Sequence, residues 1–413
     1  MVNDTGTKGI LHRLCCQPPA TQPWFYLAVL LVLAMMTACT STARHGQEAM
    51  HAAPHRHGPG PESVPLQATP ALNLGAVSDL ERVIPELADK RVILVGEIHN
   101  RFDHHQIQLE IIRGLHAIHP RLAIGMEAFQ QPFQGVLDDY IDGRLSEQEL
   151  LRDTEYYQRW RYDFRHYAPI LRYARENRLP VIALNVPQEL TRKVGRAGLD
   201  GLTNEERERL PAEIDRSDAA YEARLREVHQ QHPGNSRHSF DHFIEVQLLW
   251  DEGMAEQAAD YLREHPDTVM VVLAGGGHLA YGSGIPRRLE RRLPANIAVV
   301  LNGWDGSLTP DLADYLLLPE KRSLPAAGKF GALLDDSAGV LSVDSCMTDS
   351  PCKAAGIRHG DQFISINGEP IANMADLRLV TWDKQPGESV TLVIRRKHWW
   401  WQSQELSLEI VLY

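Results

Sequence analysis

Short apolar runs, each followed by polar residues, recur along the middle of this chain. They occupy residues 91–96, 121–126, 180–184, 268–274 and 297–301. Between the runs, apolar residues recur at helical spacing, as at Ile107, Ile111, Ile112 and Leu115 after the first run. Strands that alternate with helices predict an α/β domain with a mainly parallel sheet flanked by helices.

The polar residues that follow these runs are the candidate site. Glu97 and His99 follow the first run, Glu127 the second, Asn185 the third, and His278 follows the fourth after three glycines. The carboxyl ends of parallel strands lie at one edge of a sheet, and open α/β sheets bind ligands at that edge. We therefore expect these side chains to converge.

Two long segments between the runs predict helical insertions over the strand ends. Residues 133–178 carry nine aromatic side chains, and residues 203–265 are charged and helical in pattern. One helical stripe cannot bury so many aromatic rings, so we expect several to face a cleft or the solvent. There they would roof a flat apolar ligand.

The C-terminal part has a different pattern. After a Pro- and Leu-rich connection, residues 309–328, apolar and polar residues alternate from residue 329 to residue 413. Turn signals occur at Asn367-Gly368 and Pro386-Gly387. This pattern predicts a small, β-rich second domain, with the first domain covering residues 74–308.

Length and charge limit the function classes. A chain of 413 residues is too long for one ordinary domain. Its formal charge of −12 leaves no basic surplus to neutralise phosphates, so nucleic acid is excluded as a partner.

Residues 1–39 have the pattern of a signal peptide. A weakly basic start precedes an apolar run over residues 24–36, which is too short to span a bilayer. The run ends in Met36-Thr37-Ala38-Cys39, which resembles the lipobox of bacterial lipoproteins. The resemblance implies that Cys39 is lipidated and anchors the protein in the cell envelope, at the outer membrane, facing the periplasm or the cell surface. An ordinary cleaved signal or a short anchor helix is the alternative.

Residues 40–73 are rich in Pro, Gly, Ala and His, with almost nothing to form a core. This composition predicts a flexible tether. Its histidines share no fixed ligand spacing, which favours a tether over a metal site.

The candidate site allows several chemistries. The four side chains Glu97, His99, Glu127 and His278 suit a divalent metal such as zinc or manganese. Without a metal, Glu97 with His99 or His278 suits a general-base pair.

Haem instead requires an axial ligand, a flat apolar slot and cations for its propionates. The candidates for these roles are His99, His278, Tyr281, His166, Tyr156, Tyr157 and Arg161. A structural role is the remaining alternative, in which Glu97 and His278 only bind loop backbone.

Five motifs, in order, resemble one family. GEIHN…DHH, GMEAF, YAPILRYARENRLPVIALNVP, VQLLWDEGMAEQ and AGGGHLAYGSGIPRRL are similar to the ChaN-like haem-binding uptake lipoproteins. The wider superfamily includes erythromycin-esterase-like hydrolases and Tiki-type metalloproteases, whose glutamate and histidine motifs are similar to those here. The resemblance implies a haem or metal site at the strand ends and does not decide whether catalysis occurs.

The C-terminal part resembles a PDZ domain through its AGI-x-x-GD-x-I-x-x-ING core, residues 355–368. The resemblance implies a protein partner whose C-terminal strand pairs with the edge formed by Gly331, Ala332, Leu333 and Leu334. Phe330 stands where the family commonly has another glycine, which departs from the usual carboxylate-binding loop.

A disulfide is expected in the C-terminal domain. If the leader is removed and Cys39 is acylated, Cys346 and Cys352 are the remaining thiols in an oxidising compartment, and we expect them to pair.

Together these patterns favour a haem-binding lipoprotein of the bacterial cell envelope that takes part in haem or iron acquisition. Its PDZ-like domain would bind a protein, and a homodimer would allow two chains to share a haem ligand. The first alternative is a metal-dependent hydrolase, an esterase or a peptidase, and the second is a scaffolding lipoprotein.

Overall fold

The computed structural model describes residues 74–231, 239–303, 306, 308–397 and 402–413. The expected leader, its Cys39 and the tether lie outside the described residues. Within the described ranges, the helices all lack the combination of length and hydropathy needed to cross a membrane.

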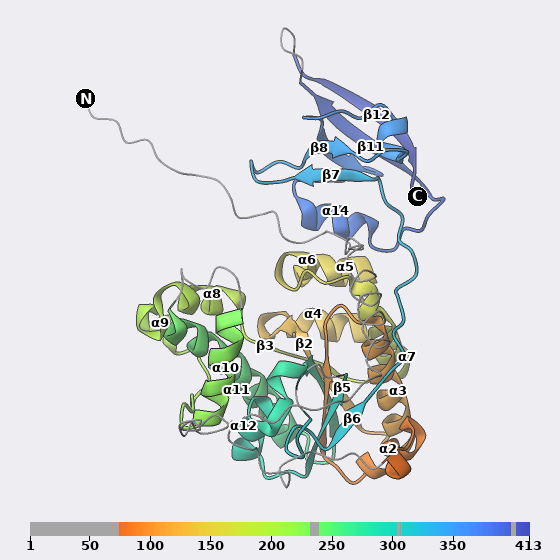
Figure 1. Cartoon of the computed structure of the whole chain (residues 1–413). Helices are drawn as coiled ribbons and strands as arrows, with labels where there is room; N and C mark the ends of the chain where they lie inside the picture. The colour runs from red at the N-terminus through yellow and green to blue at the C-terminus, as the bar shows by residue number, and fades with distance from the viewer. Residues whose placement is uncertain (1–73, 232–238, 304–305, 307, 398–401) are drawn as a thin grey trace, which may run out of the picture. The chain divides into compact units, whose positions relative to one another are not determined.

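Six parallel strands form the first sheet, in the order β3-β2-β4-β1-β5-β6 (Figure 1). The strands are β1 Val92–Glu97, β2 Leu122–Gln130, β3 Val181–Asn185, β4 Val269–Gly275, β5 Ile297–Asn302 and β6 Tyr315–Leu317. Glu97 pairs with Gly275, and Met126 pairs with Leu273, so the carboxyl ends of β1, β2 and β4 lie side by side. The predicted parallel sheet is confirmed.

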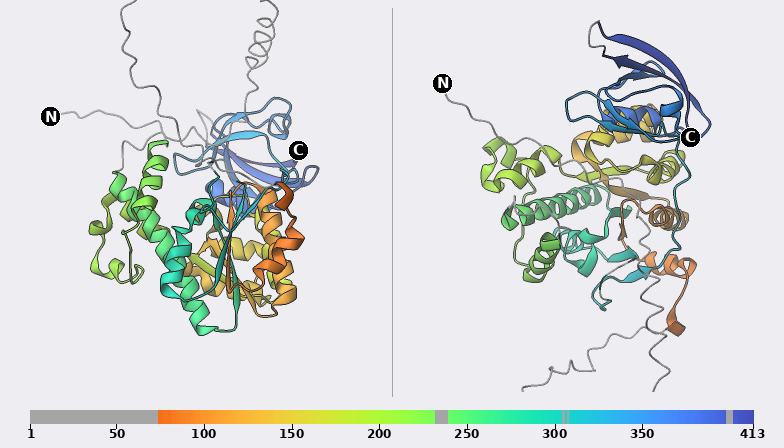
Figure 2. Two further views of the ribbon diagram at one scale, coloured as in Figure 1. Left: turned by 60° about the horizontal axis from the view of Figure 1, so that its bottom comes forward. Right: turned by 45° about the horizontal axis from the view of Figure 1, so that its top comes forward.

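Helices cover both faces of this sheet (Figure 2). Alternate strand residues face opposite layers because successive side chains of a strand point to opposite sides. Ile93 and Val95 pack in one hydrophobic cluster with the layer of α2, α3, α4, α5 and α7. Val92 and Leu94 pack in another with α11 and α12. The helices are α2 Leu80–Leu87, α3 Phe102–Ile118, α4 Gln134–Ile141, α5 Glu147–Asp153, α6 Tyr156–Arg159, α7 Ala168–Asn177, α8 Gln188–Ala197, α9 Asn204–Arg207, α10 Ala219–Gln231, α11 Phe240–Glu264 and α12 Ile285–Arg292.

The two expected insertions are helical. The first, between β2 and β3, contains α4 to α7, and the second, between β3 and β4, contains α8 to α11. The expected aromatic roof is confirmed only in part, because Trp160 and Tyr162 pack on His99 but five of the nine rings are buried in the core: Tyr140, Tyr156, Tyr157, Phe164 and Tyr167. The rings pack on one another, as Tyr156 does on Phe164 at 5.3 Å between centroids.

The stretch expected to be a linker contributes to the first domain. Residues 315–317 form β6, which pairs with β5 from Val300 to Asn302. Three residues with no alternation carry no strand signal, so this edge of the sheet could not be read from the sequence. The first domain thus extends beyond residue 308.

The C-terminal domain is an antiparallel sheet in the order β12-β11-β9-β8-β7, with β10 paired to β9. Its elements are β7 Ala332–Asp335, β8 Ser342–Cys346, α13 Pro351–Ala354, β9 Gln362–Ile366, β10 Glu369–Pro370, α14 Met374–Thr381, β11 Ser389–Arg396 and β12 Gln404–Val411. A disulfide joins Cys346 at the end of β8 to Cys352 in α13, with 5.6 Å between their Cα atoms. Strand β7 lies at the edge of the sheet.

Candidate functional site

Glu97, the last residue of β1, is the centre of a buried polar cluster. Its Oε1 accepts a hydrogen bond from the Tyr167 hydroxyl at 2.6 Å and lies 2.9 Å from Nδ1 of His99. Its Oε2 accepts from Nε2 of Gln108 at 2.7 Å and lies 3.2 Å from Nδ1 of His105. Burial opposes ionisation of this carboxyl, but His105 and His99 outweigh it and hold the pKa of Glu97 well below its usual range. Glu97 is therefore a fixed carboxylate.

His99 is oriented by that carboxylate. With Nδ1 on Glu97, the Nε2 edge of the ring faces the turn after β4, where it lies 3.2 Å from the point that a Cβ on Gly275 would occupy. Trp160 packs edge-on against the ring at 4.7 Å and Tyr162 packs at 4.9 Å. Burial alone would lower the pKa of His99, but the hydrogen bond that His99 donates to Glu97 and the charge of Glu127 raise it. A carboxylate–histidine pair of this kind suits a general base.

His278 ends the short 3₁₀ turn η7, Gly276–His278, which directly follows β4. Its Nδ1 lies 2.6 Å from Oδ1 of Asp251 in α11, and its Nε2 lies 3.5 Å from Oε1 of Glu127. Burial disfavours the charged ring, but these two carboxylates raise the pKa of His278 to about 9. At neutral pH His278 is therefore an imidazolium that donates from Nδ1 to Asp251.

Glu127 and Asn185 connect the neighbouring strand ends. Oε2 of Glu127 accepts from the backbone N–H of Gly275 at 2.6 Å, and its backbone carbonyl accepts from the Asn185 side chain at 3.1 Å. The structure thus brings together the residues that follow the first four runs, as the parallel order of the strands requires.

The side chains that were expected to bind a metal instead form ion pairs with one another. Among the residues that the structure describes, no group of three or more His, Cys, Asp or Glu side chains is arranged to hold a metal. Both oxygens of Glu97 already accept hydrogen bonds. The expectation of zinc or manganese finds no support in this donor set.

Two cavities open at the strand ends. The smaller, about 250 Å³, is lined by Glu97, Asn302, Gly96 of β1 and glycines that follow β4 and β5. The larger, about 420 Å³, is called the main cavity here and is lined by His278 and Tyr281 together with α10 and α11. Its volume falls within the range of cofactor sites.

The walls of the main cavity combine apolar, aromatic and cationic groups. Leu225, Val228 and Phe243 supply apolar surface, and Arg224 lies 4.6 Å above the Tyr281 ring. Tyr281 has φ 63°, a left-handed conformation that is unusual outside glycine and concentrates at functional sites. An aromatic hydroxyl, an imidazolium and a guanidinium around apolar walls fit the needs of a haem.

The other expected haem residues lie elsewhere. Tyr156, Tyr157 and His166 are at most 5% exposed and pack in the core. Burial raises the pKa of Tyr156 and of Tyr157, and burial lowers the pKa of His166 to about 4. Arg161 is exposed and donates to the Gln158 carbonyl. The structure brings none of these four to the walls of the main cavity.

Sequence reasoning missed the partners that orient the two histidines. Asp251 is fully buried on α11 and accepts a hydrogen bond from the Tyr221 hydroxyl as well as binding His278. Its signal was a carboxylate inside an otherwise apolar helical stripe, in VQLLWDEG. Gln108 had a weaker signal, since it falls four residues after His104 on the core face of α3.

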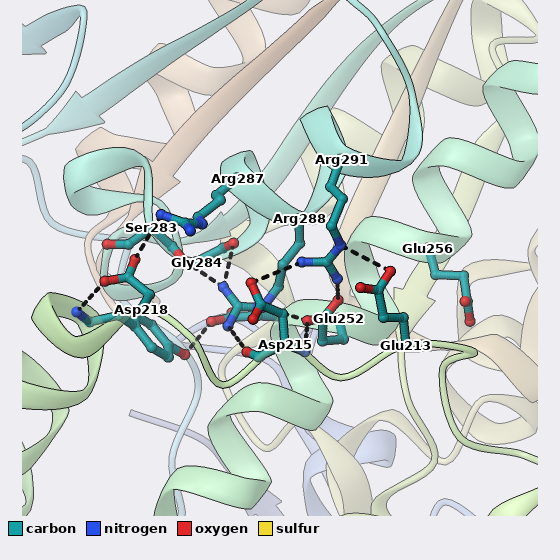
Figure 3. A network of polar contacts seen from close by, with 12 residues as sticks. Glu213, Asp215, Asp218, Glu252, Glu256, Ser283, Gly284, Arg287, Arg288 and Arg291 are labelled. Atoms are coloured by element: carbon teal, nitrogen blue, oxygen red, sulfur yellow. Dashed lines mark hydrogen bonds and ion pairs between the residues drawn. The ribbon is translucent and has the colours of Figure 1, made fainter.

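A buried network behind Asp251 fixes this arrangement (Figure 3). Arg288 of α12 is 1% exposed, pairs with Glu252 at 3.2 Å, and donates to the carbonyls of Ser283 and Gly284. Its guanidinium also lies 4.8 Å over the ring of Tyr221. The turn that follows Tyr281 and the ring that binds Asp251 are thus held by the same side chain.

Two known proteins are similar in sequence to parts of this chain. Over 246 residues, 54% of this chain, it is 26% identical to the chloroplastic protein RETICULATA-RELATED 5 of Arabidopsis thaliana. Over 144 residues, 33% of this chain, it is 27% identical to a probable periplasmic serine endoprotease, DegP-like, of Bartonella henselae. The chain spans about a third of the first relative (32%) and a quarter of the second (24%).

Solved structures resemble the first domain at low identity. ChaN of Campylobacter jejuni, solved with cofacial haem, is 19% identical, with a TM-score of 0.48; the match covers 59% of this chain and 92% of that one. Erythromycin esterase EreC in its open conformation is 15% identical, with a TM-score of 0.34, over 54% of this chain and 72% of that one.

Family models cover both domains. The PDZ model matches residues 323–395. The model described as haem-binding uptake, Tiki superfamily, ChaN matches residues 83–289, half of the 413-residue chain. The chain therefore belongs to this ChaN-like haem-binding family and carries a PDZ domain after the family's α/β domain.

Proposed function

We propose that this protein binds haem in the main cavity and takes part in haem or iron acquisition in a bacterial cell envelope, anchored by a lipid on Cys39. Family membership supports haem as the ligand. The single observation that carries the proposed position is that the main cavity joins Tyr281, His278 and Arg224 to apolar walls.

Tyr281 is the axial ligand in this proposal. An imidazolium has no lone pair for iron, and the two carboxylates near His278 keep it protonated at neutral pH. A tyrosinate binds ferric haem iron in other proteins. His278 then supplies a positive charge in the wall of the same cavity.

Titration of the purified protein with haemin tests this proposal. Saturable binding with a shifted Soret band is expected, and Tyr281→Phe should change the spectrum and weaken binding. His116→Phe, an aromatic exchange remote from the cavity at the Tyr173 hydroxyl, is the control. Absence of saturable binding, or a Tyr281→Phe spectrum identical to that of the parent protein, would contradict the proposal. Sedimentation of the loaded protein would show whether haem joins two chains.

A hydrolase is the second candidate, and the Glu97–His99 pair favours it. Simple haem storage needs no buried carboxylate that orients a histidine, whereas ester hydrolysis needs a base of this kind. His278, as an imidazolium on the other side of Gly275, would stabilise a developing oxyanion. We expect any such activity to be independent of added metal and to fall by at least about 100-fold in His99→Ala. A panel of activated esters, assayed with and without a chelator, decides the matter.

The C-terminal domain is proposed to bind a protein partner at the edge strand β7. Leu333 in this strand is 55% exposed, and an edge strand offers unpaired backbone groups to an added peptide. Calorimetry with peptides that end in apolar residues tests this binding mode. If neither haem nor ester is recognised and only such peptides bind, the scaffolding alternative gains support.

A further inference from the structure

A second hollow lies beside the main cavity and shares walls with it. This side cavity, about 290 Å³, is lined by Arg192 and Arg196 of α8 and by Val246 and Trp250 of α11. Phe243 and Gln247 line both cavities.

The two cavities also meet at a ring contact. Trp250, in the side cavity, packs edge-on against His278, in the main cavity, with 6.1 Å between the ring centroids. Phe243, Gln247 and Trp250 of α11 therefore connect the surroundings of His278 with the cavity that Arg192 and Arg196 line.

Those two arginines differ from others that border a hollow. They lie four residues apart on one face of α8, exposed, and neither side chain has a hydrogen bond or ion pair within the described ranges. In the open hollow of α4, α5 and α7, by contrast, Arg144 is paired with Asp139 and Arg172 with Glu147. Arg159 and, to a lesser extent, Arg192 lower the pKa of Glu189, but neither Arg192 nor Arg196 forms an ion pair with a described carboxylate. Two such cations, at the rim of an apolar cavity, match a ligand that carries its own carboxylates.

We propose that Arg192 and Arg196 bind the carboxylates of an apolar, flat dicarboxylate whose body lies in the main cavity, so that the side cavity is the propionate end of the haem site. This inference rests on the proposed function. It adds an orientation of the ligand. The carboxylates point toward α8, and the metal-bearing centre lies beside Tyr281 and His278.

The test compares haemin with its dimethyl ester, which lacks both carboxylates, in the full-length protein. We expect Arg192→Ala/Arg196→Ala to weaken haemin binding roughly tenfold or more and to leave ester binding unchanged. The lysine pair, Arg192→Lys/Arg196→Lys, keeps the charge and should recover part of the affinity. Arg144→Ala/Arg172→Ala makes the same charge change at the other hollow and should bind haemin normally.

The outcomes separate the two proposals. If the parent protein does not bind haemin, the proposed function fails. If it binds and the Arg192→Ala/Arg196→Ala protein binds equally well, only the carboxylate assignment fails. Equal losses for haemin and for the ester would show a structural effect and would also overturn the assignment, as would an equal loss in the control pair.

Discussion

At the scale of single residues, the site contains two carboxylate–histidine pairs with different properties. Glu97 is shared among four partners, so its charge is spread over His99, His105, Gln108 and Tyr167. Asp251 instead interacts with two partners, His278 and Tyr221. In the Glu97–His99 pair, the second ring nitrogen of His99 is available for proton transfer. In the Asp251–His278 pair, the carboxylate stabilises the positive charge of His278. A hydrolytic site would need the Glu97–His99 pair as a base, whereas a haem site would not. Substitutions of single residues therefore distinguish the two candidate functions.

The charge of His278 should make stability depend on pH. Because its folded pKa is raised from 6.5 to about 9, its contribution is complete below pH 6.5 and is lost as the pH rises through 9. The size of the shift corresponds to a loss on the order of 3 kcal/mol of unfolding free energy. In Asp251→Asn the difference between pH 6 and pH 10 should shrink markedly, as measured by urea denaturation. Identical pH profiles for the two proteins would contradict the assigned charge.

Gly275 should tolerate no side chain. A Cβ at this position would lie 3.0 Å from Cε1 and 3.2 Å from Nε2 of His99, so this ring would have to shift, while Cδ2 of His278 at 3.5 Å is at ordinary contact distance. We expect Gly275→Ala to cost about 1–3 kcal/mol of unfolding free energy and to weaken haemin binding. Gly135→Ala in α4, where a Cβ meets nothing within 4 Å, is the control and should be neutral or stabilising. Thermal unfolding and haemin titration measure both effects.

At the scale of elements, the sequence predicted those features that follow from the periodicity of apolar residues. The apolar runs predicted five of the strands. The polar residues that follow the runs predicted that Glu97, Glu127 and His278 meet where the carboxyl ends of parallel strands lie side by side. Periodicity does not tell which buried carboxylate of a helix faces a loop, so Asp251 was missed. It also overestimated the exposed aromatics, since rings such as Tyr156 pack on other rings between short helices rather than along one stripe.

The contact between α11 and α12 should be among the most sensitive in the domain. Glu252 is fully buried and meets Arg288, Arg291 and Arg292, and the network continues to Glu213 and Asp215 (Figure 3). Removing one partner of a buried ion pair leaves an uncompensated charge, so Glu252→Gln should cost about 3–5 kcal/mol.

The matched control is Glu110→Gln, whose pair with Arg113 is half-exposed on α3 and should contribute less than about 1 kcal/mol. Urea denaturation measures both variants. Equal costs would show that the α11–α12 network is as weak as a surface pair. Haemin binding should also fall in Glu252→Gln, because Arg288 holds the turn after Tyr281.

The disulfide of the PDZ domain should stabilise that domain locally. The bond closes a loop with a sequence separation of 6, for which the chain-entropy model gives about 2 kcal/mol. Cys346→Ser/Cys352→Ser should lose roughly this amount, measured by denaturation of the PDZ domain within the full chain. Haemin binding should stay unchanged. Thiol labelling of the unfolded, unreduced protein should modify neither cysteine, and labelling of both would contradict the pairing.

At the scale of the whole molecule, membrane attachment is proposed to depend on one residue. The apolar run over residues 24–36 contains about 13 residues and would extend only about 20 Å as a helix, less than the roughly 30 Å of a bilayer core. We therefore propose that a covalent lipid attaches this chain to a membrane. We expect labelled fatty acid to be incorporated at Cys39 and lost in Cys39→Ser. Cys15→Ser and Cys16→Ser, in the same leader, should retain the label, because processing would remove those residues. A mature protein without lipid, or a label that persists in Cys39→Ser, would refute the assignment of Cys39 as the lipid anchor.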